Sequence, residues 1–161
     1  DVRSEEIIRY VCAALVVCGK HYLMTKSPSR ALELFKKAAV TGAGRVKVLQ
    51  EIILALVDVG MGKEAAEYIK RFPANHQASP LFQSLNFVVD DQVTHSASMS
   101  LERGRYLLSQ MNVHEPIVYL VLIRRSIESG MKTAAEQLVD DARKRWPEQG
   151  EKFKQALGWQ P

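Results

Sequence analysis

The chain lacks the features that define several classes of protein. Aromatic residues make up only 7% of its 161 residues, and no run of five or six charges of one sign occurs. The apolar run at residues 11–18 has eight residues, whereas a membrane-crossing helix needs about 20. The sequence opens on acidic and basic residues, unlike a secretion signal. We therefore expect no membrane span, no secretory leader and no polybasic nucleic-acid arm.

Only two cysteines are present, and they favour a reducing environment. Cys12 and Cys18 lie six positions apart in one apolar segment, so on a helix they face different sides and are not expected to pair. Buried free thiols are typical of reducing compartments, and we therefore expect a cytoplasmic location. The start at Asp1 rather than Met also fits a processed or excised piece of a longer protein.

The residues that are abundant favour helices. Ala, Leu, Val, Lys, Arg, Glu and Gln dominate, and the apolar spacing is helical almost throughout, so we predict an all-α fold. The segment VVDDQVTHSASM is the weakest part of this pattern, and we interpret it as a frayed helix end followed by a loop. Proline and glycine clusters separate the predicted helices. They cover residues 4–25, 29–41, 45–59, 62–72, 79–91, 98–111, 115–129, 131–145 and 148–157.

A pattern of small and large residues recurs along the chain. A shift of 34 positions carries Lys26 to Gly60, and it carries one apolar ladder onto another. The ladders are Ala31, Phe35, Ala38 and Ala65, Ile69, Phe72. A further occurrence near the C-terminus consists of Gly130, Ala135, Val139, Ala142 and Pro147. Between them, Gly104, Leu108 and Met111 fit the ladder if five extra residues are allowed.

This pattern resembles the tetratricopeptide repeat, in which W-x2-L-G-x2-Y is followed by A-x3-F-x2-A and a proline. In the first unit the matching residues are Leu15, Cys18, Gly19, Tyr22, Ala31, Phe35 and Ala38, with Leu15 and Cys18 as substitutes. The second unit keeps Gly60 and Ala65 but has Ile53 and Leu56 instead of the Gly-Tyr pair. The resemblance covers about residues 4–147.

The resemblance implies an antiparallel helix-pair solenoid wound as a right-handed superhelix. We expect one domain, 1–161, with three or four repeats at about 12–45, 46–79, 80–115 and 116–149, and a capping helix within 150–161 that carries Phe153, Leu157 and Trp159. Gly19 is expected to let two helices approach closely. Stacking is needed because one helix pair cannot bury its apolar face alone.

The resemblance also implies a concave groove lined by the first helix of each pair. An apolar groove rimmed by Lys20, Lys47 and Arg124 suits an amphipathic helix or extended peptide of some acidic character. Val16 and Leu54 stand where the repeats that grip chaperone tails carry polar residues, which argues against that role. Some of the apolar residues can equally belong to the core. The expected groove residues are Ala13, Val16, Lys20, Leu23, Lys47, Gln50, Leu54, Val57, Ile117, Leu120, Arg124 and Ile127.

No residue pattern in the sequence points to catalysis, a metal or a cofactor. Gly19-Lys20 lacks the further glycines of a phosphate loop. Asp90, Asp91 and His95 are too few for a metal site, and we interpret them as a solvated turn. His21, His76 and His114 are expected at the surface. Arg103, Arg105, Arg124 and Arg125 could contact RNA, but an ordinary charged surface is the simpler interpretation.

The favoured function is therefore a non-enzymatic protein-binding module, such as a scaffold, adaptor or small chaperone. One alternative is a structural segment of a larger solenoid, which would self-associate or pack on an assembly. A second alternative is a helical-repeat RNA binder, although nucleic acid is not the expected partner.

Overall fold

The computed structural model describes residues 1–158, and its secondary structure is helical. Nine α-helices and two short 3₁₀ turns follow one another, and no strand occurs within these residues. The all-α prediction is confirmed. The nine predicted helices match the observed ones in order, and most of their ends agree within two residues.

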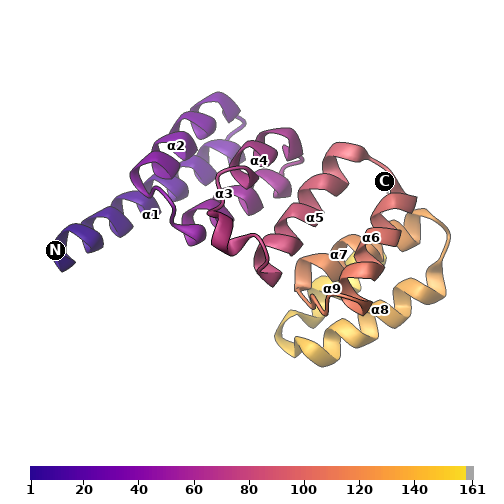
Figure 1. Cartoon of the computed structure of the whole chain (residues 1–161). Helices are drawn as coiled ribbons and strands as arrows, with labels where there is room; N and C mark the ends of the chain where they lie inside the picture. Colours follow the sequence, from indigo (N-terminus) through magenta and orange to yellow (C-terminus); the bar gives the residue numbers. More distant parts are fainter. Residues whose placement is uncertain (159–161) are drawn as a thin grey trace. The chain divides into compact units, whose positions relative to one another are not determined.

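The chain forms two compact units, residues 1–77 and the residues from 78 onward. The division falls close to the boundary expected between the second and third repeats. In the first unit α1 and α2 lie side by side and α3 and α4 form a second pair, as Figure 1 shows in indigo to magenta. The helices are α1 (Val2–Met24), α2 (Pro28–Thr41), α3 (Val46–Asp58) and α4 (Gly62–Ile69), followed by a 3₁₀ turn, Ala74–His76.

In the second unit α7 is the central helix, because it packs on α5, α6, α8 and α9. Pro80 and Pro116 occupy the first position of their helices, where the missing proline N–H leaves no hydrogen bond unmade. The helices are α5 (Pro80–Thr94), α6 (Ala97–Ser109), α7 (Pro116–Glu128), α8 (Lys132–Arg145) and α9 (Gly150–Leu157), with a 3₁₀ turn, Pro147–Gln149, before α9.

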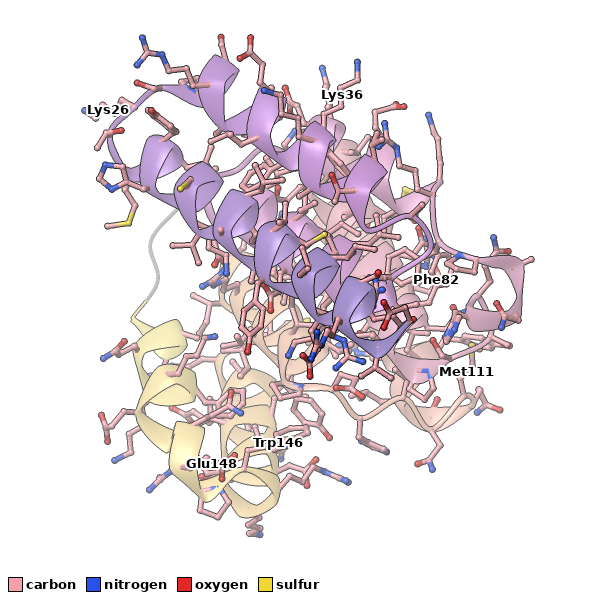
Figure 2. The ribbon with its side chains drawn as sticks, turned by 90° about the vertical axis from the view of Figure 1, so that its left-hand side faces the viewer. Lys26, Lys36, Phe82, Met111, Trp146 and Glu148 are labelled. Atoms are coloured by element: carbon pink, nitrogen blue, oxygen red, sulfur yellow. The ribbon has the colours of Figure 1, made fainter. Side chains whose placement is uncertain are left out.

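The turn that joins the helices of each pair contains one residue in the left-handed conformation. Lys26, Gly60, His95 and Gly130 have φ of 59°, 77°, 51° and 72°, and they are 34, 35 and 35 residues apart. Figure 2 labels Lys26 in the first of these turns. In three of the turns the next N–H donates to a carbonyl five residues earlier: Ser27 to Tyr22, Met61 to Leu56 and Met131 to Ser126, at 2.8–2.9 Å. These are Schellman helix ends.

Residues at fixed distances from the turn are buried along the second helix of each pair, and in the second pair the last of them, Phe72, lies just beyond the end of α4. Five, nine and twelve residues after the turn come a small residue and two packing positions, and all of these but the half-buried Ile69 are buried. The sets are Ala31, Phe35, Ala38; Ala65, Ile69, Phe72; Ser100, Gly104, Leu107; and Ala135, Val139, Ala142. The predicted register of the third set was wrong, because Met111 is exposed beyond the end of α6 and no five-residue insertion is present.

The segment predicted as a frayed end and loop is also different. Helix α5 continues to Thr94, whose Oγ1 donates to the Asp90 carbonyl at 2.8 Å. Only His95 and Ser96 lie between α5 and α6, and the Ser96 side chain caps α6 by accepting from the Met99 N–H. The prediction failed because two aspartates and a histidine were interpreted as solvent-facing, whereas Asp91 is buried.

The two thiols have different surroundings. Cys12 is buried and its Sγ lies 3.6 Å from the Ala38 carbonyl oxygen, as expected for a core thiol. Cys18 is exposed, so its predicted burial was wrong.

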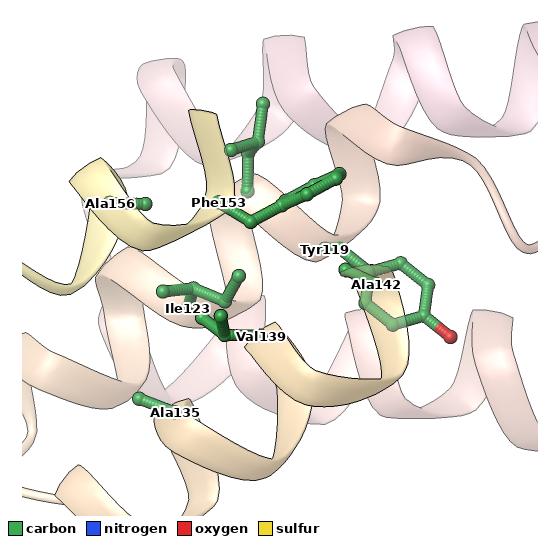
Figure 3. Close-up of a cluster of buried hydrophobic side chains, with 8 residues drawn as sticks. Tyr119, Ile123, Ala135, Val139, Ala142, Phe153 and Ala156 are labelled. Carbon is green, nitrogen blue, oxygen red and sulfur yellow. The ribbon is translucent and has the colours of Figure 1, made fainter. Parts of the chain in front are cut away.

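The last helix closes a cluster of buried side chains. Figure 3 shows Phe153 and Ala156 of α9 against Tyr119 and Ile123 of α7 and residues of α8. The indole of Trp146 stands edge-on to the Tyr119 ring, with centroids 5.3 Å apart. Trp159, expected in the same cap, lies outside the described residues.

Helix α1 is the one helix among residues 1–158 that is long and apolar enough to cross a membrane. Its most apolar 18-residue window has a mean hydropathy of 1.4, and 17% of that window is buried. The uninterrupted apolar run counted in the sequence is shorter than this helix. Core helices of soluble proteins meet the same criterion, so length and composition by themselves do not establish a span.

Candidate functional site

The residues expected to line a groove in the first unit differ in their exposure. Val16 and Val57 are buried, so they contribute to the core rather than to a contact surface. Lys20 and Lys47 are exposed, and Ala13 is exposed beside them on α1. The remaining three residues are half-buried: Leu23, Gln50 and Leu54.

In the second unit the expected groove residues lie on α7. Leu120 is buried in the cluster shown in Figure 3, and Ile127 packs against the same cluster. Ile117 is half-buried and Arg124 is exposed. The expected set is thus divided between the two units, and three of its members lie in the cores.

A hollow with a volume of about 510 Å³ lies between α5 and α6. We call it the α5–α6 groove. The left-handed residue His95 and the Ser96 cap fix the turn that sets the two helices side by side. Its lining residues are Phe87, Asp90, Asp91, Thr94, Met99, Ser100, Glu102, Arg103 and Tyr106.

The apolar part of this groove combines one buried ring with two exposed side chains. Phe87 is buried, and its Cζ lies 3.0 Å from the position that a Cβ on Gly104 would take. Met99 and Tyr106 are 60% and 56% exposed, which is high for large apolar side chains. Methionine and tyrosine at such places are typical of binding surfaces, because one adapts its shape and the other combines an apolar ring with a hydroxyl.

The charged rim of the groove is organised by an ion pair between the two helices. Arg103 of α6 binds the Asp90 carboxylate of α5. Glu102 is exposed next to them and has no ion-pair partner among residues 1–158. Both signs of charge are therefore available to a ligand at the rim.

Beneath the rim, Asp91 anchors α5 to both neighbouring helices. Its carboxylate accepts from the Ser100 hydroxyl at 2.6 Å and from Nε and Nη2 of Arg125 at 2.8 and 3.0 Å. Arg125 Nη1 also donates to Glu128 at 2.5 Å. The hydrogen bonds to Asp91, with Glu128 adding to them, raise the pKa of the Arg125 guanidinium further above its ordinary value. The interpretation of Asp91 and Arg125 as solvated surface residues was wrong.

A signal in the sequence could have found this anchor. Asp91 lies four residues before the left-handed turn residue, as do Tyr22, Leu56 and Ser126 in the other helix pairs. Leu56 and Ser126 are buried, so an aspartate in that register needs a partner inside the protein. The incorrect register of the third repeat hid this relationship.

A second polar network joins α7 to α8. The Tyr119 hydroxyl donates to Asp141 at 2.5 Å and lies 3.0 Å from His114 Nδ1, and Arg145 Nε donates to Asp141 at 3.1 Å. Burial, followed by the hydrogen bond to Asp141, raises the pKa of the Tyr119 phenol, and the same bond lowers the pKa of Asp141. His114 is half-buried here, which corrects its expected surface position.

Two further hollows are present, one larger and one smaller than the α5–α6 groove. The larger, of about 640 Å³, lies beside α8 and the turn before α9, and most of its lining side chains are charged. The smaller, of about 230 Å³, lies between α6, α7 and α8, and four of its nine lining residues are leucines. It includes Ser126, whose buried Oγ has no hydrogen-bond partner within residues 1–158. No three His, Cys, Asp or Glu side chains in residues 1–158 converge as metal ligands. The three candidate ligands near the end of α5 do not converge. Asp90 pairs with Arg103, Asp91 pairs with Arg125, and His95 lies in the exposed turn.

No family model, curated protein or solved structure matches the chain. The function must therefore be inferred from the geometry of the chain itself.

Proposed function

We propose that this chain is a tetratricopeptide-like module that binds a segment of a partner protein. In this proposal four helix pairs stack as a right-handed solenoid and α9 caps the last pair. The observation that carries it is the recurrence of one left-handed turn every 34 or 35 residues, followed at fixed distances by buried ladder positions. Repeats of this kind expose long surfaces on a rigid scaffold, and their common use is peptide binding.

The α5–α6 groove is the binding site in this proposal. Its ligand is an amphipathic helix or an extended segment that places an apolar anchor between Met99 and Tyr106, above Phe87. A charged residue next to the anchor would pair with Glu102 or Arg103 at the rim. Exposed aromatic and methionine side chains in a concave surface are the kind of residue that dominates binding energy.

The arginines favour a protein partner over RNA. Arg103 and Arg125 are held by Asp90 and Asp91, so part of the positive charge considered for phosphate contacts is neutralised within the unit. Phosphate recognition draws its affinity from unpaired cations. The groove also carries the exposed carboxylate of Glu102, which would repel a phosphate backbone.

The test is selection of 12-residue peptides from a displayed random library on the 161-residue chain, followed by fluorescence anisotropy of each selected peptide. We expect enrichment of peptides with an apolar anchor next to a charged residue. Tyr106→Ala and Met99→Ala should each weaken binding about tenfold, which corresponds to about 1.4 kcal/mol.

The control is Val40→Ala, because Val40 is a large apolar side chain on α2 that is more exposed than Met99 and Tyr106. Its dissociation constants should equal those of the unaltered chain. Peptides that respond to Leu54→Ala and Lys20→Ala but not to Tyr106→Ala would place the site on the surface expected from the sequence instead. Failure to enrich any peptide would contradict the proposed function.

A further inference from the structure

Helix α1 carries a stripe of exposed side chains with the spacing of a coiled-coil seam. Alternate steps of four and three residues connect its members, and the large apolar ones are 61–82% exposed. We call this set the α1 stripe. It consists of Arg3, Ile7, Tyr10, Ala14, Val17, His21 and Met24.

The stripe lies opposite the face of α1 that packs on the rest of the first unit. The buried residues of α1 are Cys12, Val16 and Gly19. At about 100° per residue they lie on the opposite side of the helix from the stripe. Nothing among residues 1–158 covers the stripe, since its members are exposed. Seven positions at this spacing extend over about six helical turns, each of 5.4 Å.

The charges beside the stripe identify its occupant. One flank has Glu6, Ala13 and Lys20, at intervals of seven residues, and the other has Ser4, Val11 and Cys18. All six are exposed. In a parallel copy of α1 this flank would face the other flank of the partner helix, so Glu6 would lie near Val11 and the charges would stay unpaired. An antiparallel copy sets Glu6 against Lys20 twice, so the flank is complementary to itself only in that direction.

The register that pairs these charges also packs the stripe. With Glu6 next to Lys20 of the second copy, Ile7 meets Val17 and the large Tyr10 meets the small Ala14. On the other flank Val11 meets Val11, and Ser4 meets Cys18. A shift by one heptad loses both Glu–Lys pairs, so one register is preferred.

We propose that the α1 stripe is the interface of a homodimer in which two α1 helices pack antiparallel with Glu6 of each copy against Lys20 of the other. The interface is isologous, as the two-fold axis of a dimer requires. The dimer lies entirely on the first unit, so it goes beyond peptide binding at the α5–α6 groove and can fail independently of it.

The first experiment is sedimentation equilibrium of the 161-residue chain over a wide concentration range. We expect a monomer–dimer equilibrium. Glu6→Lys and Lys20→Glu should each weaken the dimer at least about tenfold, because each replaces two attractions with two repulsions. The double variant Glu6→Lys/Lys20→Glu should recover the dissociation constant of the unaltered chain, while circular dichroism shows that helix content is unchanged.

The second experiment tests the register by a crosslink. Ser4→Cys places a thiol against Cys18 of the second copy, and mild oxidation by dissolved oxygen removes two protons and two electrons as the S–S bond forms. The two positions are 14 residues, about 21 Å, apart within one helix, so the bond can form only between copies. The double variant Ser4→Cys/Cys18→Ser should form no crosslink. As a further control, Glu33→Cys, at an exposed position of α2, should not crosslink to Cys18.

The proposal is overturned if the chain stays monomeric at every concentration. It is also overturned if the double charge exchange fails to restore the dimer, or if the crosslink forms without Cys18. Monomers that instead bind phospholipid vesicles through α1 would assign the stripe to a membrane surface and would likewise overturn it. Unchanged peptide binding by Glu6→Lys would show that the groove proposal is unaffected.

Discussion

Gly19 of α1 and Phe35 of α2 are in direct contact because Gly19 has no side chain. A Cβ at Gly19 would stand 2.4 Å from Phe35 Cε1 and 2.7 Å from Cδ1, closer than real carbon atoms approach. Phe35 is completely buried. The expected role of Gly19 in the approach of two helices is confirmed, and its place within α1, in its last two turns, excludes a phosphate loop.

Gly19→Ala is therefore expected to destabilise the first unit, although alanine favours helices. Overpacking against a fixed ring costs about 1–3 kcal/mol. The matched control is Gly150→Ala in α9, where the nearest atom would lie at an ordinary 3.6 Å. That change should be neutral or stabilise by up to about 1 kcal/mol. Urea unfolding measures both, and equal effects would contradict the contact.

Arg125→Met should be far more costly than Arg124→Met, although the two residues are adjacent on α7. The Arg125 side chain is 16% exposed and carries two hydrogen bonds to the buried Asp91, whereas Arg124 is exposed. Loss of Arg125 leaves a buried carboxylate underpaired, at a cost of about 3 kcal/mol. Arg124→Met should change the unfolding free energy by no more than about 0.5 kcal/mol. A small effect at both positions would show that the Asp91 anchor does not stabilise the unit.

Lys26→Gly is expected to stabilise the chain by about 0.5–1 kcal/mol. The φ of Lys26 is 59°, a conformation that strains a residue with a side chain. The equivalent turn positions 60 and 130 are occupied by glycine. Lys36→Gly is the control, because Lys36 points outward from the middle of α2 in Figure 2 and should lose about 1 kcal/mol. Thermal unfolding would separate the two signs, and destabilisation at both positions would refute the turn geometry.

Tyr119→Phe should lower stability at neutral pH but not at low pH. Its hydroxyl keeps the pKa of Asp141 below the ordinary 3.8. A lowered pKa in the folded state contributes stability that is present above the unfolded pKa and is lost as the pH falls through the folded pKa. We expect a loss of about 1 kcal/mol at pH 7, which shrinks as the pH falls below 3.8.

The measurement for Tyr119→Phe is urea unfolding across this pH range, with the Asp141 carboxyl followed by NMR. Its pKa should rise toward the ordinary value in the variant. Tyr106→Phe removes an exposed hydroxyl and should leave both quantities unchanged. A Tyr119→Phe deficit that persists undiminished at low pH would show that the bond to Asp141 is not its cause.

Most helix boundaries could be predicted because their determinants are local. Prolines at 28, 80 and 116 begin helices, and glycines at 60 and 130 follow their ends. The turn after α5 had neither a glycine nor a proline, since His95 takes the left-handed conformation there. His95 lies 35 residues from the turn glycines on either side, Gly60 and Gly130. This spacing can be seen in the sequence only if residues are counted from turn to turn rather than from ladder to ladder.

The α5–α6 groove could not be predicted from the same patterns. Met99 and Tyr106 are ordinary helix residues in the sequence, and only the packing of α5 on α6 sets them above Phe87. The expected groove residues Val16 and Leu120 have apolar side chains at helical spacing, and such side chains serve a core or a surface equally well. Periodicity identifies a helix face but not the neighbour that covers it.

The sequence by itself determined the helical class, the order of the helices and the small residues at their contacts, because these follow from local propensity and spacing. The tertiary structure decided which polar groups are buried. Asp91 and Arg125 lie 34 positions apart, and no short-range pattern distinguishes their pairing from a charged surface. It likewise decided that the exposed side of α1 is apolar at coiled-coil spacing, because which face of a helix is left uncovered depends on the helices that pack against it.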